Sequence, residues 1–90
     1  MHENSDIEAE IRRQTAIAGP QASIGPSEVA RALSPPPPSE VWRGKLSAVR
    51  RAAMRLAQAG EIDILRKGKP VDPAAAVKGV IRLRLRPPVA

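Results

Sequence analysis

The sequence has no cysteine, no phenylalanine and no tyrosine among its 90 residues. Without cysteine, neither a disulfide framework nor a thiolate metal site can form. The single histidine is His2, close to the start of the chain, so a zinc site or a histidine-based catalytic pair has nothing to build on. Trp42 is the only aromatic residue, which argues against single-strand nucleic-acid binding by base stacking. We therefore expect no metal and no cofactor.

Long hydrophobic runs are also absent. No apolar stretch approaches the roughly 20 residues that a membrane-spanning helix needs. The first ten residues, MHENSDIEAE, are acidic and polar and do not look like a signal peptide. A chain of this length allows one domain with a small core. The sequence therefore predicts a soluble cytoplasmic protein that makes no membrane contact.

Charge is unevenly distributed along the chain. The net charge is +6, but residues 1–40 carry a balance of −3 and residues 41–90 a balance of +9. A strongly basic half attracts polyanions such as nucleic acid. We expect any such contact to be made by residues 41–90.

The stretch from Val41 to Gly60 shows the clearest periodicity. At 100° per residue, one face gathers apolar side chains, namely Trp42, Leu46, Val49, Ala53, Leu56 and Ala57. The rest of the wheel includes Arg43, Ser47, Arg50, Arg51, Met54 and Arg55. Gly44 leaves two alternatives open: one helix, or a short turn over Glu40–Arg43 followed by a helix over Lys45–Ala59.

Two further helices are expected before this stretch. Ser5 and Glu8 have the spacing of a capping box, so the first helix is predicted over Asp6–Ala18, ending at Gly19-Pro20. A short edge strand can form over Ala22–Ile24. A second, short helix is predicted over Ser27–Leu33, after the helix-start signal of Pro26.

The run Pro35–Pro38 must end the second helix, because proline lacks the N–H that a helix needs. We expect these residues to form a stiff, extended connector. A proline-rich ligand for a partner domain is the weaker alternative.

The period changes to two after Gly60. Apolar and charged residues alternate over Glu61–Lys67 and again over Ile81–Arg86, which predicts two antiparallel strands. The connection Gly68–Gly79 is long for a hairpin loop, and long loops in small domains are often functional. Glu61 and Asp63 can pair with Arg82 or Arg84 across the strands, which would remove those arginines from any binding surface.

This order of elements predicts an α+β fold of the winged helix-turn-helix type, with three helices and a C-terminal β-hairpin, the wing. The domain is expected over residues 6–86, with Pro35–Pro38 as an internal linker, a flexible N-terminus over residues 1–5 and a tail over residues 87–90. In that fold the third helix enters the DNA major groove and the wing reaches the backbone.

The sequence thus predicts a double-stranded DNA-binding module, and a transcriptional regulator is one such role. RNA is a less favoured partner. The expected contacts are Arg43, Ser47, Arg50, Arg51, Arg55, Lys67, Lys69 and Lys78. Six contacts between cations and phosphates would give a log–log salt slope of about −5.

The sequence favours three other functions less than DNA binding. A winged helix used for protein contact is the main alternative, with Met54 as an adaptable contact. A membrane-surface helix is less favoured, because it would bury in lipid the apolar face of Val41–Gly60 that the core needs. An enzyme is not expected, because the acids Glu61, Asp63 and Asp72 have no partner base in the body of the chain. A dimer is possible, and nothing in the sequence fixes the oligomeric state.

Four stretches carry a resemblance to a known family: SEVARAL, VWRGKLSAVRRAAMRLAQAG, EIDILRKGKPVDP and KGVIRLRL. In them, from about Ile24 to Leu85, the chain resembles the small bacterial family known as domain of unknown function 3253. The resemblance implies a winged-helix fold and supplies no biochemical role. Pro35–Pro38 lengthens the link between the second and third helices beyond the usual three or four residues.

Overall fold

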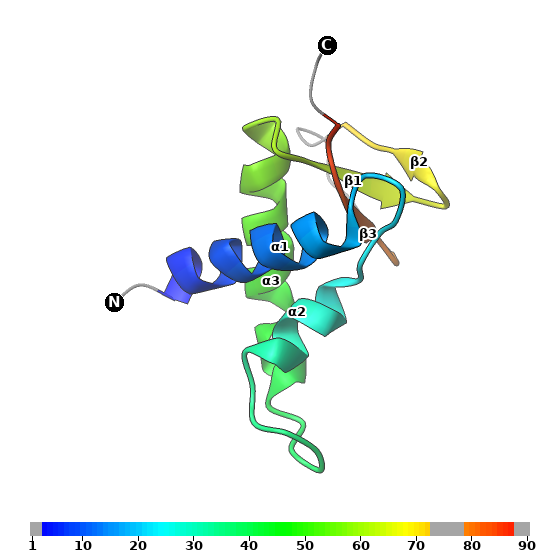
Figure 1. Cartoon of the computed structure of the whole chain (residues 1–90). Coiled ribbons are helices and arrows are strands. Elements are labelled where there is room, and N and C mark those ends of the chain that lie inside the picture. Colours follow the sequence, from blue (N-terminus) through cyan, green and yellow to red (C-terminus); the bar gives the residue numbers. More distant parts are fainter. Residues whose placement is uncertain (1–2, 73–78, 88–90) are drawn as a thin grey trace.

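The computed structural model describes residues 3–72 and 79–87 of the chain. Three helices and a three-stranded antiparallel sheet form an α+β fold, as expected (Figure 1). The elements are α1 Glu3–Ala18, α2 Pro26–Ala32, α3 Trp42–Gln58, β1 Ile62–Arg66, β2 Lys69–Pro70 and β3 Arg82–Leu85. Of the expected termini, residues 1–2 and 88–90 lie outside the described residues, and residues 3–5 belong to α1.

Helix α3 is the central element. It runs from the loop that follows α2, at one end of the molecule, to the sheet at the other, and α1 crosses it (Figure 1). Its buried residues recur at the helical period, as predicted: Val49, Ala52, Ala53, Leu56 and Ala57. The helix continues unbroken through Gly44. Of the two open alternatives, the single helix is therefore correct.

The N-terminal boundary of α1 differs from the prediction. The helix begins at Glu3, so Ser5 lies inside it and the predicted capping box at Ser5 and Glu8 is wrong. Glu8 instead reaches across to Arg55 of α3. Ile7 and Ile11 are fully buried in the core, as the apolar spacing predicted. The Glu8 carboxylate, which was predicted to cap α1, thus forms a tertiary ion pair with α3.

Helix α2 begins at Pro26, the residue that signalled a helix start, and ends at Ala32, one residue before the predicted end. The backbone N–H of Gly25 donates to Glu28 Oε2 at 2.6 Å, which satisfies a free donor at the helix start. Val29 and Ala30 are completely buried. This short helix therefore owes its stability to packing, since seven residues are too few for an independent helix.

The two predicted strands pair as expected. β1 lies at the centre of the sheet, and Ile62 faces Leu85 while Ile64 faces Leu83 on antiparallel β3. The short strand predicted over Ala22–Ile24 is reduced to one bridge, in which Ile24 exchanges two backbone hydrogen bonds with Leu83. A turn and a helix start lie on either side of Ile24, so no further residue can pair.

The first part of the connection after β1 forms a turn and a strand that its length did not suggest, and residues 73–78 lie outside the described residues. Lys67 and Gly68 both have positive φ, 53° and 81°, which is the pattern of a type I′ turn. The chain then pairs back on β1 through β2, with Leu65 opposite Pro70. The turn was missed because Lys-Gly is not among the usual sequences of this turn, and glycine supplies only its second position.

The proline run is also different from the extended connector that was expected. The Ser39 N–H donates to Pro36 O at 3.2 Å, so the chain turns within the run. The Pro37–Pro38 peptide bond is cis. All four prolines are exposed. A turned run cannot present the continuous extended helix that proline-recognition domains bind, so the proline-ligand alternative loses its structural basis.

Gly44 gives a direct test of the α3 boundary. A Cβ at this position would meet no atom within 4 Å. We expect Gly44→Ala to raise the free energy of unfolding by about 0.5–1 kcal/mol, because glycine costs that much within a helix. Gly19→Ala is the matched control: it also enters open space, but at φ +78°, so it should destabilise the domain. Urea unfolding measures both. Destabilisation by Gly44→Ala would contradict the continuous helix.

Candidate nucleic-acid interface

The outer face of α3 is the first part of the predicted site. Arg51 lies on this face, exposed to solvent, and its side chain makes no hydrogen bond or ion pair with any residue of 3–72 or 79–87. Ser47 precedes it by four residues and is also exposed, so the two side chains are neighbours on the helix surface. Two predicted contacts therefore share one open helical face.

Two other predicted arginines of α3 are ion-paired within the domain. Arg55 Nε lies 2.7 Å from Glu8 Oε2 of α1, and Arg43 Nε lies 2.7 Å from Glu40 Oε1. A guanidinium held by a carboxylate must give up that pair before it can bind a phosphate fully. We therefore rank Arg43 and Arg55 below Arg51 as nucleic-acid contacts.

Arg50 links α3 to the segment that leads into β3. Its Nη1 donates to the backbone oxygen of Gly79 at 3.0 Å. From the other side, Arg66 at the end of β1 reaches the same glycine so closely that a Cβ there would collide with its guanidinium. Gly79 has φ +83°. Arg50 and Arg66 are thus brought together by a glycine that has no side chain to separate them.

Sequence reasoning missed Arg66. The signal that could have found it is the alternation along β1, since Ile62 and Ile64 are buried and Arg66 continues the same side of the strand. That side of β1 faces the core, so Arg66, the last residue of the strand, lies at the edge of the core.

A small hollow lies beside these arginines, with a volume of about 160 Å³. It is lined by Arg50, Arg51, Met54 and Ile81. The hollow places the cationic side of α3 next to the start of β3.

The turn between β1 and β2 carries the next two predicted contacts. Lys67 and Lys69 are exposed, and neither side chain forms a hydrogen bond or ion pair within the described part of the chain. Lys78, the remaining predicted contact, lies outside the described residues. We call the set Arg50, Arg51, Arg66, Lys67 and Lys69 the basic strip.

The strand arginines are held by the domain itself, as the sequence allowed. Asp63 binds Arg84 at 3.1 Å and Arg86 at 2.9 Å. Arg82 instead donates to two oxygens of Ser23, the side-chain Oγ and the backbone oxygen. Glu61 pairs with Arg12 of α1 at 2.8 Å, not with a strand arginine. These contacts give the last strand a structural role.

Three carboxylates have a lowered pKa because of these contacts. Burial raises the pKa of Asp63, but hydrogen bonds and charge from Arg84 and Arg86 outweigh it, so the pKa lies below its ordinary value. The hydrogen bond from Arg12 lowers the pKa of Glu61, and that from Arg13 lowers the pKa of Glu10.

These shifts predict acid sensitivity. A carboxylate whose pKa is lower in the folded state stabilises the fold above its unfolded pKa, near 4, and loses this contribution as the pH falls through the folded pKa. We expect the free energy of unfolding to fall between about pH 4 and about pH 3. Urea titrations at several pH values measure it. Equal or greater stability at the lower pH would contradict these ion pairs.

The model of a family described as a protein of unknown function (DUF3253) matches residues 4–86. The chain belongs to the DUF3253 family. This match confirms the resemblance carried by the four sequence stretches and extends it through α1. No curated protein matches the chain. The family description names no ligand, so the function has to be inferred from the basic strip.

Two further features of this DUF3253 protein concern its described residues. Within residues 3–72 and 79–87, no three His, Cys, Asp or Glu side chains are grouped so that they could hold a metal ion. In the same residues, no helix is both long and apolar enough to cross a bilayer. What the basic strip can do is present hydrogen-bond donors and positive charge to phosphate groups.

Proposed function

We propose that this chain is a winged-helix module that binds double-stranded DNA through the outer face of α3 and the β1–β2 turn. The observation that carries the proposal is the contrast between two sets of cations. The domain neutralises one set with its own carboxylates: Arg12, Arg13, Arg43, Arg55, Arg84 and Arg86. In the basic strip, Arg51, Lys67 and Lys69 carry charge that no described carboxylate offsets.

The winged-helix assignment is supported by the path of the chain. Three helices precede the sheet, and Ile24, between α1 and α2, bridges to β3. The strand order β2-β1-β3 supports this assignment, with the β1–β2 turn as part of the wing. In a winged helix the third helix reads the major groove and the wing lies on the neighbouring backbone. Both parts of the basic strip then occupy DNA-facing positions.

The long link between α2 and α3 does not weaken this assignment. α2 packs against α3 despite the proline turn, and Val29 and Ala30 are completely buried. Packing, rather than the length of the link, sets the angle between two helices.

Binding would be dominated by phosphate contacts. Arg51 offers a planar fork that can pair with a phosphate or with guanine O6 and N7, and Ser47 can donate to a phosphate. Lys67 and Lys69 would act as point charges on the backbone. Such an interface binds many sequences with similar affinity and weakens steeply with salt.

An NMR titration tests the proposal. Labelled protein is titrated with a short mixed-sequence duplex at low and at moderate salt. We expect shifts concentrated at residues 47–54 and 66–69 that shrink as salt rises. An absence of shifts at low salt, or shifts confined to α1, would contradict the proposal.

The same domain could instead use this face to bind a protein. Met54, half-buried beside the hollow, is an adaptable interface residue. Arg51→Glu separates the two functions: if retention on heparin and in gel shifts is unchanged while a pull-down partner is lost, protein contact replaces DNA binding.

A further inference from the structure

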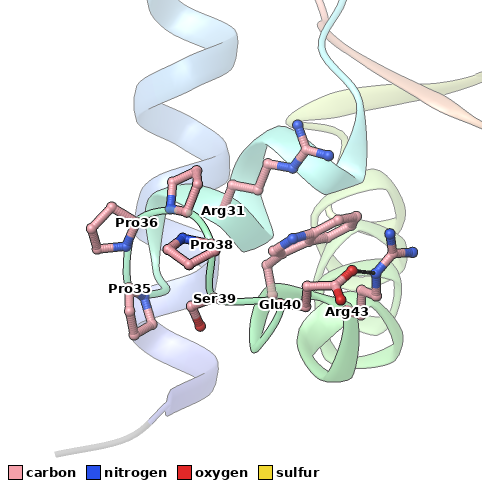
Figure 2. Close-up of a pocket in the computed structure, with 9 residues that line it drawn as sticks. Arg31, Pro35, Pro36, Pro38, Ser39, Glu40 and Arg43 are labelled. Carbon is pink, nitrogen blue, oxygen red and sulfur yellow. Dashed lines mark hydrogen bonds and ion pairs between the residues drawn. The ribbon is translucent and has the colours of Figure 1, made fainter.

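A second candidate site lies at the opposite end of α3 from the sheet. The last turn of α2, the proline turn and the first turn of α3 enclose a pocket of about 410 Å³. That volume is within the range of pockets that hold small molecules. The proline rings of Pro35, Pro36 and Pro38 line one side, and Glu40 and Arg43 lie on the other (Figure 2).

Two arginines of this pocket lie close to the Trp42 ring. The guanidinium carbon of Arg31 lies 4.3 Å from the centre of the indole ring, and that of Arg43 lies 4.6 Å away. Both distances are within the reach of a cation–π interaction. Stacking on the ring restricts both arginine side chains, so less conformational entropy is lost when a ligand binds them.

Arg31 and Arg43 differ in their polar contacts. Arg43 is ion-paired with Glu40 at 2.7 Å. The side chain of Arg31 makes no hydrogen bond or ion pair to the described residues, although it is positioned by the indole. Its planar fork is therefore available to an anion, and a carboxylate matches the fork with two parallel hydrogen bonds. The three ionisable side chains of the lining carry a net charge of +1, which also favours an anion.

Apart from Ser39, the rest of the lining is apolar. Proline rings have no N–H to donate, and the half-buried indole of Trp42 presents its hydrocarbon surface. A ligand that only carried charge would leave this surface unused, and a neutral apolar ligand would leave Arg31 unpaired.

We propose that this pocket binds a small organic anion, a carboxylate joined to an apolar body. Arg31 holds the carboxylate, and Trp42 and the proline rings contact the body. The site is separate from the basic strip and does not depend on DNA binding. An acidic segment of a partner protein has related chemistry, but the size of the pocket favours the small molecule.

Trp42 makes the test direct, because it is the only tryptophan in the chain. Its indole N–H resonance is followed by NMR while cyclohexanecarboxylate, cyclohexylmethanol or acetate is added up to about 10 mM. We expect the carboxylate with the ring to bind about tenfold more tightly than either control, since only it satisfies both parts of the pocket. Equal responses to all three, or no response, would overturn the proposal.

Three variants locate the binding group. Arg31→Gln should weaken cyclohexanecarboxylate about tenfold and leave cyclohexylmethanol unchanged, which also shows that the pocket is intact. Glu40→Gln should strengthen the carboxylate about threefold, because it removes a negative charge from the lining. Arg13→Gln removes a positive charge outside the pocket and should leave carboxylate binding unchanged. Unaltered carboxylate binding by Arg31→Gln would overturn the proposal. So would an acidic peptide that binds while the small carboxylate does not.

Discussion

Arg51→Glu is expected to weaken binding to a short DNA duplex by about 10- to 100-fold at low salt. Arg51 lies on the outer face of α3 without a partner among the described residues, so its charge is fully available to a phosphate. Loss of one arginine contact costs about 1–3 kcal/mol, and a glutamate at the same position repels the backbone. Fluorescence anisotropy with a labelled duplex measures the change.

The control for this variant must change the net charge equally. Arg13→Glu does so from α1, where Arg13 is exposed and paired with Glu10. A general loss of attraction between protein and DNA would affect both variants alike. We expect Arg13→Glu to weaken binding only a few-fold. Equal losses for the two variants would mean that α3 has no special part in binding. Thermal melts confirm that both proteins fold.

Asp63→Asn should have the largest effect on stability among the charged residues. Its side chain is only 12% exposed, and it joins Arg84 of β3 and Arg86, which directly follows that strand. Without this carboxylate, Arg84 loses its ion-pair partner while its side chain remains 30% exposed, and its Nε already has no hydrogen-bond partner among the described residues. We expect a loss of about 2 kcal/mol.

For a domain of this size, such a loss lowers the melting temperature by about 10 °C. Glu40→Gln breaks an ion pair that is about two-thirds exposed on both sides, and should cost only a few tenths of a kcal/mol. Similar effects from both substitutions would show that the Asp63 cluster does not hold β1 and β3 together.

Much of the fold could be predicted because its elements have strong periods. The apolar face of α3 and the alternation of β1 and β3 each follow from residue spacing, and the register of Ile62 with Leu85 preserves that alternation. The boundaries set by tertiary contacts were missed. The proline run turns, and β2 pairs back on β1. Neither feature follows from a hydrophobic periodicity in the sequence.

The candidate site was less predictable, because a sequence shows where cations are but not which acids reach them. The pairing of Arg55 with Glu8 joins residues 47 positions apart, so no local pattern signals it. Asp63 was different, since strand register places it opposite Arg84. No sequence pattern marks Arg31, which is an isolated basic residue. Only the fold brings its guanidinium over Trp42.

The salt dependence of DNA affinity tests the basic strip most directly. The slope of log affinity against log salt is measured for the wild type and for the triple variant Arg51→Gln, Lys67→Gln and Lys69→Gln. Each phosphate contact contributes about 0.9 to the slope, so removing three should make it shallower by about 2.7. Identical slopes, or no measurable wild-type binding at low salt, would contradict the assignment of these three side chains to a DNA interface.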